Sequence, residues 1–166
     1  MARGEERGAG DMTRVVERVS TPPFLIHVVN PVMKRLLASP LRGPLSRGLM
    51  VLHVTGRKSG KTYDVVVGRH VVDGRLYAHA NGGWRVNLRG GAEITLTLDG
   101  TERRGHAVLV EDRDQVTDIV MTLLERLGPN NAARIGLRVN VDRMPTREEV
   151  RDGIRGDAYA LITLRD

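Results

Sequence analysis

Residues 63–80 read YDVVVGRHVVDGRLYAHA, and a second stretch, residues 93–110, reads EITLTLDGTERRGHAVLV. Each stretch places an Asp-Gly pair, at 73–74 and at 99–100, between two runs that are typical of β-strands. Asp-Gly in this position favours a two-residue β-hairpin loop. Two such hairpins in the middle of a chain predict an antiparallel sheet or barrel rather than a parallel nucleotide-binding sheet.

The segments on either side of the hairpins extend this prediction. Apolar runs predict further strands at 49–54 and 159–164. Residues 116–127 repeat apolar side chains at helical spacing, which predicts a helix that ends at residues 128–129, Gly-Pro. Residues 146–149, TREE, fit a capping box that begins a shorter helix. We therefore expect one mostly β, barrel-like domain with helices packed outside it.

The N-terminal part of the chain has a different character. Its first 20 residues are rich in glycine and charge, although the apolar residues between Met12 and Val19 have the spacing of a short helix. Asn30-Pro31 predicts the start of a second helix, with Asn as the cap. We expect residues 1–29 to be an N-terminal extension, partly flexible or helical, and residues 30–166 to form the single barrel domain.

Composition excludes several classes of function. The chain has 166 residues and no cysteine, which excludes disulfides, thiolate catalysis and cysteine-ligated metal centres. The five histidines show no ligand spacing, so we expect no metal site. No run of about 18 apolar residues is present, and the first residues lack the apolar core of a secretory signal. We therefore expect a cytoplasmic protein.

The net charge of +6 points to an anionic partner. Only three of the 26 basic residues are lysines, and two of them, Lys58 and Lys61, lie in one short segment. The chain has only five aromatic residues to stack on bases, so we expect no nucleic-acid partner. Residues 24–37 are apolar with two cations, which leaves weak contact with a membrane surface, and a peripheral location, as an alternative.

Two segments carry groups that could bind a ligand. Residues 55–61, TGRKSGK, combine two glycines, three cations and a serine between two expected strands. The alternative is a basic hairpin loop that only keeps the sheet edge soluble. Residues 81–88, NGGWRVNL, hold the one tryptophan, and Asn87 lies one turn from Trp84. The alternative there is a tryptophan that only anchors the segment in the core.

No hydrolytic triad, nucleophile elbow or carboxylate pair accompanies these segments, which favours a protein whose cofactor carries the chemistry. Their order, with a valine-rich strand between them, resembles the deazaflavin-dependent nitroreductase family of the flavin/deazaflavin oxidoreductases. The resemblance covers about residues 30–110, with a similar outline at 131–146. It implies a split β-barrel of the FMN-binding type, coenzyme F-420 as cofactor, and an actinobacterial setting.

The resemblance also implies an activity and a binding site. Such enzymes transfer hydride between the 8-hydroxy-5-deazaflavin and a small organic acceptor, such as an activated alkene, a quinone or a nitro compound. Arg57, Lys58 and Ser59 would hold the phosphate and the acidic glutamyl tail of the cofactor. The expected cofactor-binding residues are Arg57, Lys58, Ser59, Lys61, Tyr63, Val65, Val66, Ala78, His79, Ala80, Asn81, Trp84, Arg85 and Asn87.

The chain departs from the family at points that concern catalysis. Thr62-Tyr63 stands where relatives have Pro-Arg, and residues 111–158 contain no tyrosine, so the candidates for a proton donor are His79, Tyr63 and water. An FMN-binding split-barrel oxidoreductase is one alternative, and a non-enzymatic binder of an anionic ligand or membrane is another. The sequence is compatible with a monomer and with a homodimer.

Overall fold

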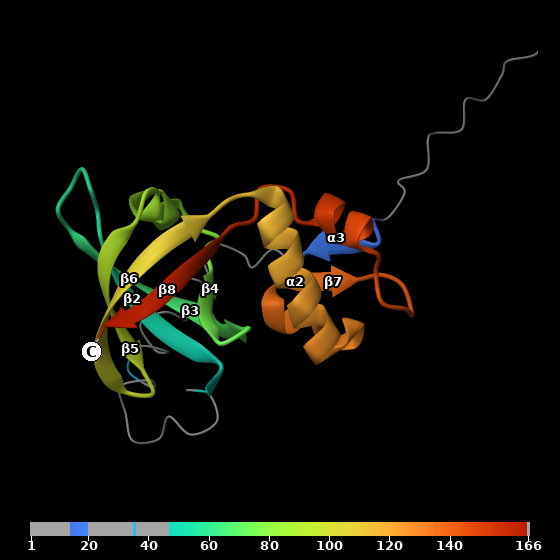
Figure 1. The fold of residues 1–166 in the computed structure, drawn as a ribbon, viewed down its shortest axis with the longest axis horizontal. Coiled ribbons are helices and arrows are strands. Elements are labelled where there is room, and N and C mark those ends of the chain that lie inside the picture. Colours follow the sequence, from blue (N-terminus) through green and yellow to red (C-terminus); the bar gives the residue numbers. More distant parts are fainter. Residues whose placement is uncertain (1–13, 20–34, 36–46, 166) are drawn as a thin grey trace, which may run out of the picture.

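The computed structural model describes residues 14–19, 35 and 47–165 of the chain. The helix expected to begin at Asn30-Pro31 lies outside these residues, and so does the segment 24–37 apart from Arg35. In the described part, a β-barrel stands beside a lobe of helices and short strands (Figure 1). Among the described residues, no helix combines the length and the apolar content that crossing a membrane requires.

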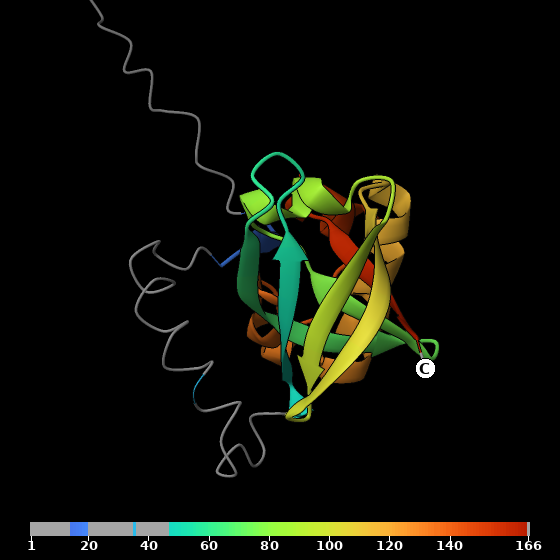
Figure 2. The ribbon, with the colours of Figure 1, turned by 90° about the vertical axis from the view of Figure 1, so that its left-hand side faces the viewer.

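Six strands close into an antiparallel barrel in the order β2-β3-β4-β8-β6-β5 (Figure 2). Their bounds are Leu49–Thr55 for β2, Thr62–Val72 for β3, Arg75–His79 for β4, Ala92–Leu98 for β5, Thr101–Val110 for β6 and Tyr159–Arg165 for β8. Every neighbouring pair in the barrel is antiparallel. The expected mostly β fold, an antiparallel barrel with helices outside it, is confirmed.

Both Asp-Gly pairs turn a hairpin. The backbone φ is 50° at Asp73 and 73° at Gly74, and it is 51° at Asp99 and 76° at Gly100. Positive φ at both central residues is the type I′ geometry, whose twist matches that of the flanking strands. The two hairpins that the sequence predicts, β3–β4 and β5–β6, are therefore present with two-residue loops.

Alternate residues of the strands fill the interior of the barrel. The buried residues of this core are Met50, Leu52, Val54, Val67, Ala78, Leu88, Ile94, Leu96, Ala107, Ala160 and Ile162. In β5, for example, Ile94 and Leu96 are buried, whereas Thr95 between them is only half-buried. An interior filled in this way is a packed core. A ligand site of this barrel is therefore to be sought at its ends or on its outer surface.

The lobe is built from five elements: α2 (Arg113–Leu127), η3 (Pro129–Ile135), β7 (Leu137–Val139), α3 (Arg147–Gly153) and β1 (Val16–Arg18). Helix α2 is the helix expected from the apolar spacing. Asp112 caps it by accepting a hydrogen bond from the Gln115 N–H at 2.9 Å. It ends at Gly128, where φ is 79°.

Helix α3 begins with the capping box that the sequence predicts. The Thr146 hydroxyl accepts the Glu149 N–H at 3.3 Å, and the Glu149 carboxylate accepts the Thr146 N–H at 2.8 Å. Arg143 also donates two hydrogen bonds to this carboxylate, at 2.8 and 2.6 Å. These bonds, from Arg143 first and Thr146 second, lower the pKa of Glu149 to about 2.

The short helix expected between residues 12 and 19 is wrong for the described residues, because 16–18 form strand β1. This strand pairs antiparallel with β7, with Val16 opposite Val139. Val16 is completely buried. The β-branched residues suit a strand as well as a helix, and the partner strand that decides between them lies more than a hundred residues further along the chain.

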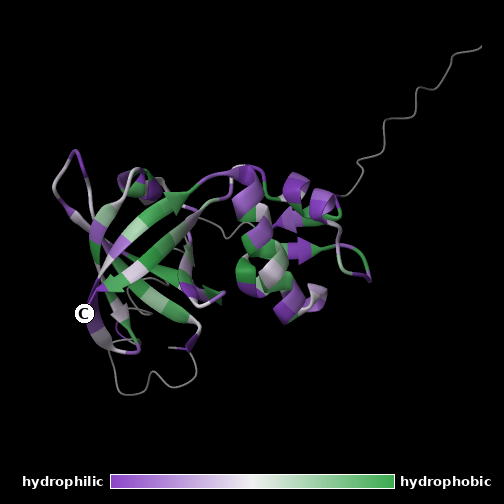
Figure 3. Ribbon diagram, viewed as in Figure 1, coloured by the Kyte–Doolittle hydropathy of each residue, from purple (hydrophilic) through white to green (hydrophobic). Residues whose placement is uncertain are grey.

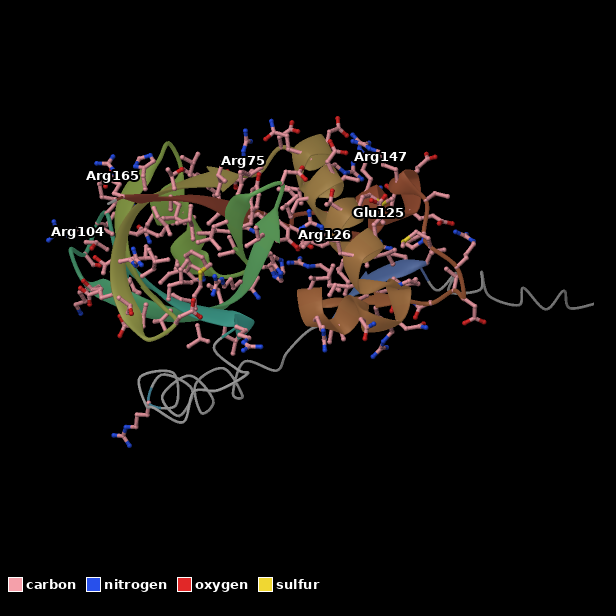
Figure 4. All side chains as sticks on the ribbon, turned by 60° about the horizontal axis from the view of Figure 1, so that its bottom comes forward. Arg75, Arg104, Glu125, Arg126, Arg147 and Arg165 are labelled. Carbon is pink, nitrogen blue, oxygen red and sulfur yellow. The ribbon has the colours of Figure 1, made fainter. Side chains whose placement is uncertain are left out.

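The lobe packs against the outer face of β3, β4 and β8. Val72, Tyr77 and Tyr159 from these strands belong to the same buried cluster as the apolar stripe of α2. Arg126 of α2 lies between the two parts (Figure 4) and donates a hydrogen bond to the Val71 carbonyl of β3. The outer face of the barrel on this side is therefore covered by the lobe.

Candidate functional site

The loop between β2 and β3, residues 56–61, is held in one shape by its own contacts. The Gly56 N–H donates to the Lys61 carbonyl and the Gly60 N–H donates to the Gly56 carbonyl, both at 2.8 Å. The Lys61 N–H also donates to Ser59 Oγ at 3.2 Å. Gly60 has a φ of 65°, a conformation that glycine adopts without strain. Figure 3 shows the hydrophilic character of this loop, which projects beyond the barrel.

The second segment forms the 3-10 helix η2 (Gly83–Leu88), which follows β4. Leu88 is completely buried in the barrel core, and Trp84 packs partly against the same core. The Asn87 side chain donates to the Trp84 carbonyl at 2.9 Å. A Cβ atom on Gly82 would lie 2.6 Å from Cδ1 of Trp84, so this position has room only for glycine unless the indole moves. Leu88 thus anchors a helix that carries Trp84 and Asn87.

The two segments, about thirty residues apart in the sequence, meet at one end of the barrel (Figures 1 and 2). Oδ1 of Asn87 accepts the backbone N–H of Arg57 at 3.0 Å. The guanidinium of Arg57 donates from Nη2 to the carbonyl of Arg89, and the same nitrogen lies 3.3 Å from the carbonyl of Gly91. The sequence singled out both segments, and the structure brings them together.

A cleft of about 650 Å³ lies between the loop and η2. Its lining residues are Gly56, Arg57, Lys58, Ser59, Tyr63, Gly83, Trp84, Val86 and Asn87. Trp84, Val86 and Tyr63 supply aromatic and aliphatic surface, whereas the loop supplies charge. Clefts of this size that combine an apolar wall with a few placed polar groups are typical of small-molecule sites.

Several polar groups of the loop have no partner within the described part of the chain. The backbone N–H groups of Lys58 and Ser59 donate to no acceptor there, although both residues line the cleft. The ammonium groups of Lys58 and Lys61 likewise form no ion pair with a described carboxylate. Free N–H groups on consecutive residues, next to cations, are the donors that an anionic group requires.

Six of the residues expected to bind a cofactor line this cleft, and eight do not. Those in the lining are Arg57, Lys58, Ser59, Tyr63, Trp84 and Asn87. Outside it are Lys61, Val65, Val66, Ala78, His79, Ala80, Asn81 and Arg85. Ala78 and Ala80 are completely buried, and the Arg85 guanidinium donates to the Gly156 carbonyl at 2.9 Å. The lining also includes Gly56, Gly83 and Val86, which belong to the same two segments although their side chains carry no polar group.

Of the two candidate proton donors, Tyr63 lies at the cleft and His79 lies outside its lining. The Tyr63 hydroxyl is 3.2 Å from Ser59 Oγ. His79 is largely buried, with Nε2 3.7 Å from Oδ1 of Asp157 and its ring against Tyr159, at 5.2 Å between ring centroids. Asp157 itself lies in a buried position, 2.5 Å from the guanidinium of Arg18. Nothing in the sequence marks Asp157, because its neighbours come from distant segments.

Burial shifts the pKa values of two residues that pack near His79. The pKa of His70 is lowered to about 4, first by burial and then by the charge of His79. The pKa of the Tyr159 hydroxyl is raised, again first by burial and then by the carboxylate of Asp157. Neither residue lines the cleft. His70 is therefore held neutral at neutral pH as part of the packing between barrel and lobe.

No protein-family model matches this chain, and no curated protein matches it. Several solved structures show a distant likeness, and two of them are as follows. A conserved hypothetical protein from Mycobacterium tuberculosis, Rv2991, is 13% identical with a TM-score of 0.45, covering 90% of this chain and 84% of that one. A second structure, described as a domain-swapped dimer, is 17% identical with a TM-score of 0.46, covering 82% of this chain and 98% of that one.

Proposed function

We propose that this chain is an oxidoreductase that binds coenzyme F-420 in the cleft between loop 56–61 and η2. The enzyme would use the reduced cofactor to deliver hydride to a small organic acceptor, such as an activated alkene, a quinone or a nitro compound. The observation that supports the proposal is the joining of a cationic loop and an aromatic wall in one cleft. It matches a ligand that has a flat ring at one end and an acidic tail at the other.

The chemistry of the loop fits the acidic part of this cofactor. The tail carries a phosphate and several carboxylates, and the loop offers two lysines without a described partner and the free N–H groups of Lys58 and Ser59. Oxyanions bind well to consecutive backbone N–H groups next to cations. In this assignment Lys58 and Ser59 hold the phosphate, and Lys61 contributes charge at the rim.

The apolar surface of the cleft fits the ring. Trp84, Val86 and Tyr63 line the cleft, and a flat aromatic ligand gains by covering such surface. When bound, the deazaflavin supplies the hydride. The protein orients the ring and the acceptor and keeps water from the ring face. In this proposal Tyr63, which lines the cleft, donates the proton, since His79 lies outside the lining and near Asp157.

The test is a titration of the purified protein with oxidised cofactor, followed by the fluorescence of the ring. We expect a dissociation constant in the micromolar range or below. Lys58→Glu combined with Lys61→Glu should abolish most of the binding, because the pair then repels the tail. The matched control combines Arg75→Glu with Arg134→Glu. It makes the same change in net charge at two exposed positions outside the cleft and should bind as the wild type does.

Two results would overturn the proposal. One is the absence of binding by the wild-type protein at micromolar concentrations. The other is a yellow protein that releases FMN on denaturation, which would assign the cleft to a flavin with a single phosphate. An equal loss of affinity in the two charge-reversed variants would refute the placement of the tail at the loop.

A further inference from the structure

Arg57 lies in the cationic loop, and the resemblance assigns it to the phosphate, yet its backbone N–H and its Nη2 atom already have protein partners. Its backbone N–H donates to Oδ1 of Asn87 at 3.0 Å. Its Nη2 atom donates to the carbonyl of Arg89 and lies 3.3 Å from that of Gly91. A single residue thus joins the loop to both ends of the segment 87–91.

We propose that Arg57 is a positioning residue. Its hydrogen bonds hold loop 56–61 against the end of η2 and so set the width of the cleft. This inference rests on the proposed function and deepens it. The anionic tail is left to Lys58 and Ser59, whose donors are free within the described chain. Arg57 therefore contributes to binding through the shape of the cleft and not through its charge.

The carbonyls that Arg57 binds are presented by an unusual backbone. Gly90 and Gly91, which follow η2, have φ values of 76° and 90°. Both carbonyls lie next to the same terminal nitrogen, Nη2, whose two N–H groups are fixed in the plane of the guanidinium, whereas the N–H groups of a lysine ammonium rotate freely on a side chain that is one atom shorter. The site thus favours arginine over lysine.

The hydrogen bonds of Arg57 also connect the loop to the aromatic wall of the cleft. Asn87 accepts from Arg57 through Oδ1 and donates from Nδ2 to the Trp84 carbonyl at 2.9 Å. Hydrogen bonds therefore run from the loop through Asn87 to Trp84. The far end of η2 is held separately, because the Arg89 guanidinium donates to both oxygens of Glu111, at 3.0 and 2.9 Å. Loss of the Arg57 guanidinium would leave the backbone hydrogen bond to Asn87 but remove the contacts with residues 89 and 91, so the loop would be held less firmly while the end of η2 stays in place.

The first test uses the protein as purified, with Trp84 as the probe. This residue is the only tryptophan of the chain, so its fluorescence reports the cleft alone. Acrylamide is an uncharged quencher and does not respond to the change in charge. We expect Arg57→Ala and Arg57→Lys to increase the quenching constant, because an unfastened loop exposes the indole. Lys58→Ala should quench as the wild type does.

The second test compares two ligands: the complete cofactor and the same deazaflavin ring without phosphate or glutamyl tail. Arg57→Ala should weaken the binding of both ligands by the same factor, about tenfold, as expected for the loss of one to two net hydrogen bonds. Lys58→Ala should weaken only the complete cofactor and should lower the salt dependence of its binding. Thermal unfolding of each variant checks that the barrel is intact.

These results distinguish a positioning role of Arg57 from direct binding of the anionic tail. Wild-type quenching in both Arg57 variants would overturn the inference. So would an Arg57→Lys variant that binds both ligands like the wild type, or a loss of affinity confined to the complete cofactor. If the wild-type protein binds neither ligand, the proposed function fails, but the quenching experiment still decides whether Arg57 holds the loop.

Discussion

Replacing His70 with phenylalanine should make the stability of this protein less sensitive to acid. His70 packs between barrel and lobe, with its ring edge toward Tyr159 at 6.3 Å between centroids. Burial and the charge of His79 lower the pKa of His70 from 6.5 to about 4. Phenylalanine keeps the aromatic contact and cannot take up a proton.

The direction of the effect follows from proton binding. In the unfolded chain His70 binds a proton near pH 6.5, whereas in the folded protein it does so only near pH 4. Between these values the unfolded state holds more protons, so the free energy of unfolding falls as the pH falls. At 1.36 kcal/mol per pKa unit, the loss at pH 4 is at most about 3 kcal/mol.

Urea denaturation at intervals between pH 4.5 and 7.5 measures this loss. Carboxylates whose pKa values are lowered by arginine partners, such as Glu111, Asp114 and Asp152, are common to wild type and variants, so their loss of stabilising effect at low pH cancels in the comparison. The free energy of unfolding of the wild type, relative to that of His70→Phe, should decrease as the pH falls, and the same decrease should appear relative to His70→Gln. A difference between wild type and variants that stays constant across this range would show that His70 does not cause the loss.

Two further substitutions test the elements that position the cleft and the lobe. Leu88→Ala removes the completely buried anchor of η2 and should lower the free energy of unfolding by about 2–5 kcal/mol, measured by urea denaturation. It should also increase the quenching of Trp84, and an unchanged stability would contradict the anchor. Thr146→Ala removes one half of the capping box of α3 and should cost about 1 kcal/mol, whereas Thr146→Ser should be close to neutral. Equal losses in both would show that the hydroxyl does not act as the cap.

Much of the fold could be predicted because its signals are local. An Asp-Gly pair between two strand-like runs carries its own turn geometry, and both hairpins formed where it occurs. The apolar spacing of residues 116–127 and the capping box at 146–149 are equally local, and both helices are present. Strand β1 could not be predicted, because Val16 and the valines beside the strand suit either structure and the partner strand β7 is distant in sequence.

In the candidate site, too, local features could be predicted and contacts between distant segments could not. The sequence singled out both segments of the cleft because glycine, cations and one tryptophan concentrate there. It could not show that Arg57 is engaged with the carbonyls after η2, because those carbonyls belong to the backbone and leave no mark in the sequence. Nor could it place His79 beside Asp157, since that contact depends on how β4 and the start of β8 pack.

The binding of coenzyme F-420 to the purified wild-type protein is the direct test of the proposed function. Titration of the protein into oxidised cofactor, with ring fluorescence as the signal, should give saturable binding at micromolar concentrations. The affinity should fall when Lys58 and Lys61 are reversed in charge, and it should hold when Arg75 and Arg134 are reversed. An unchanged ring signal at micromolar protein would contradict the account.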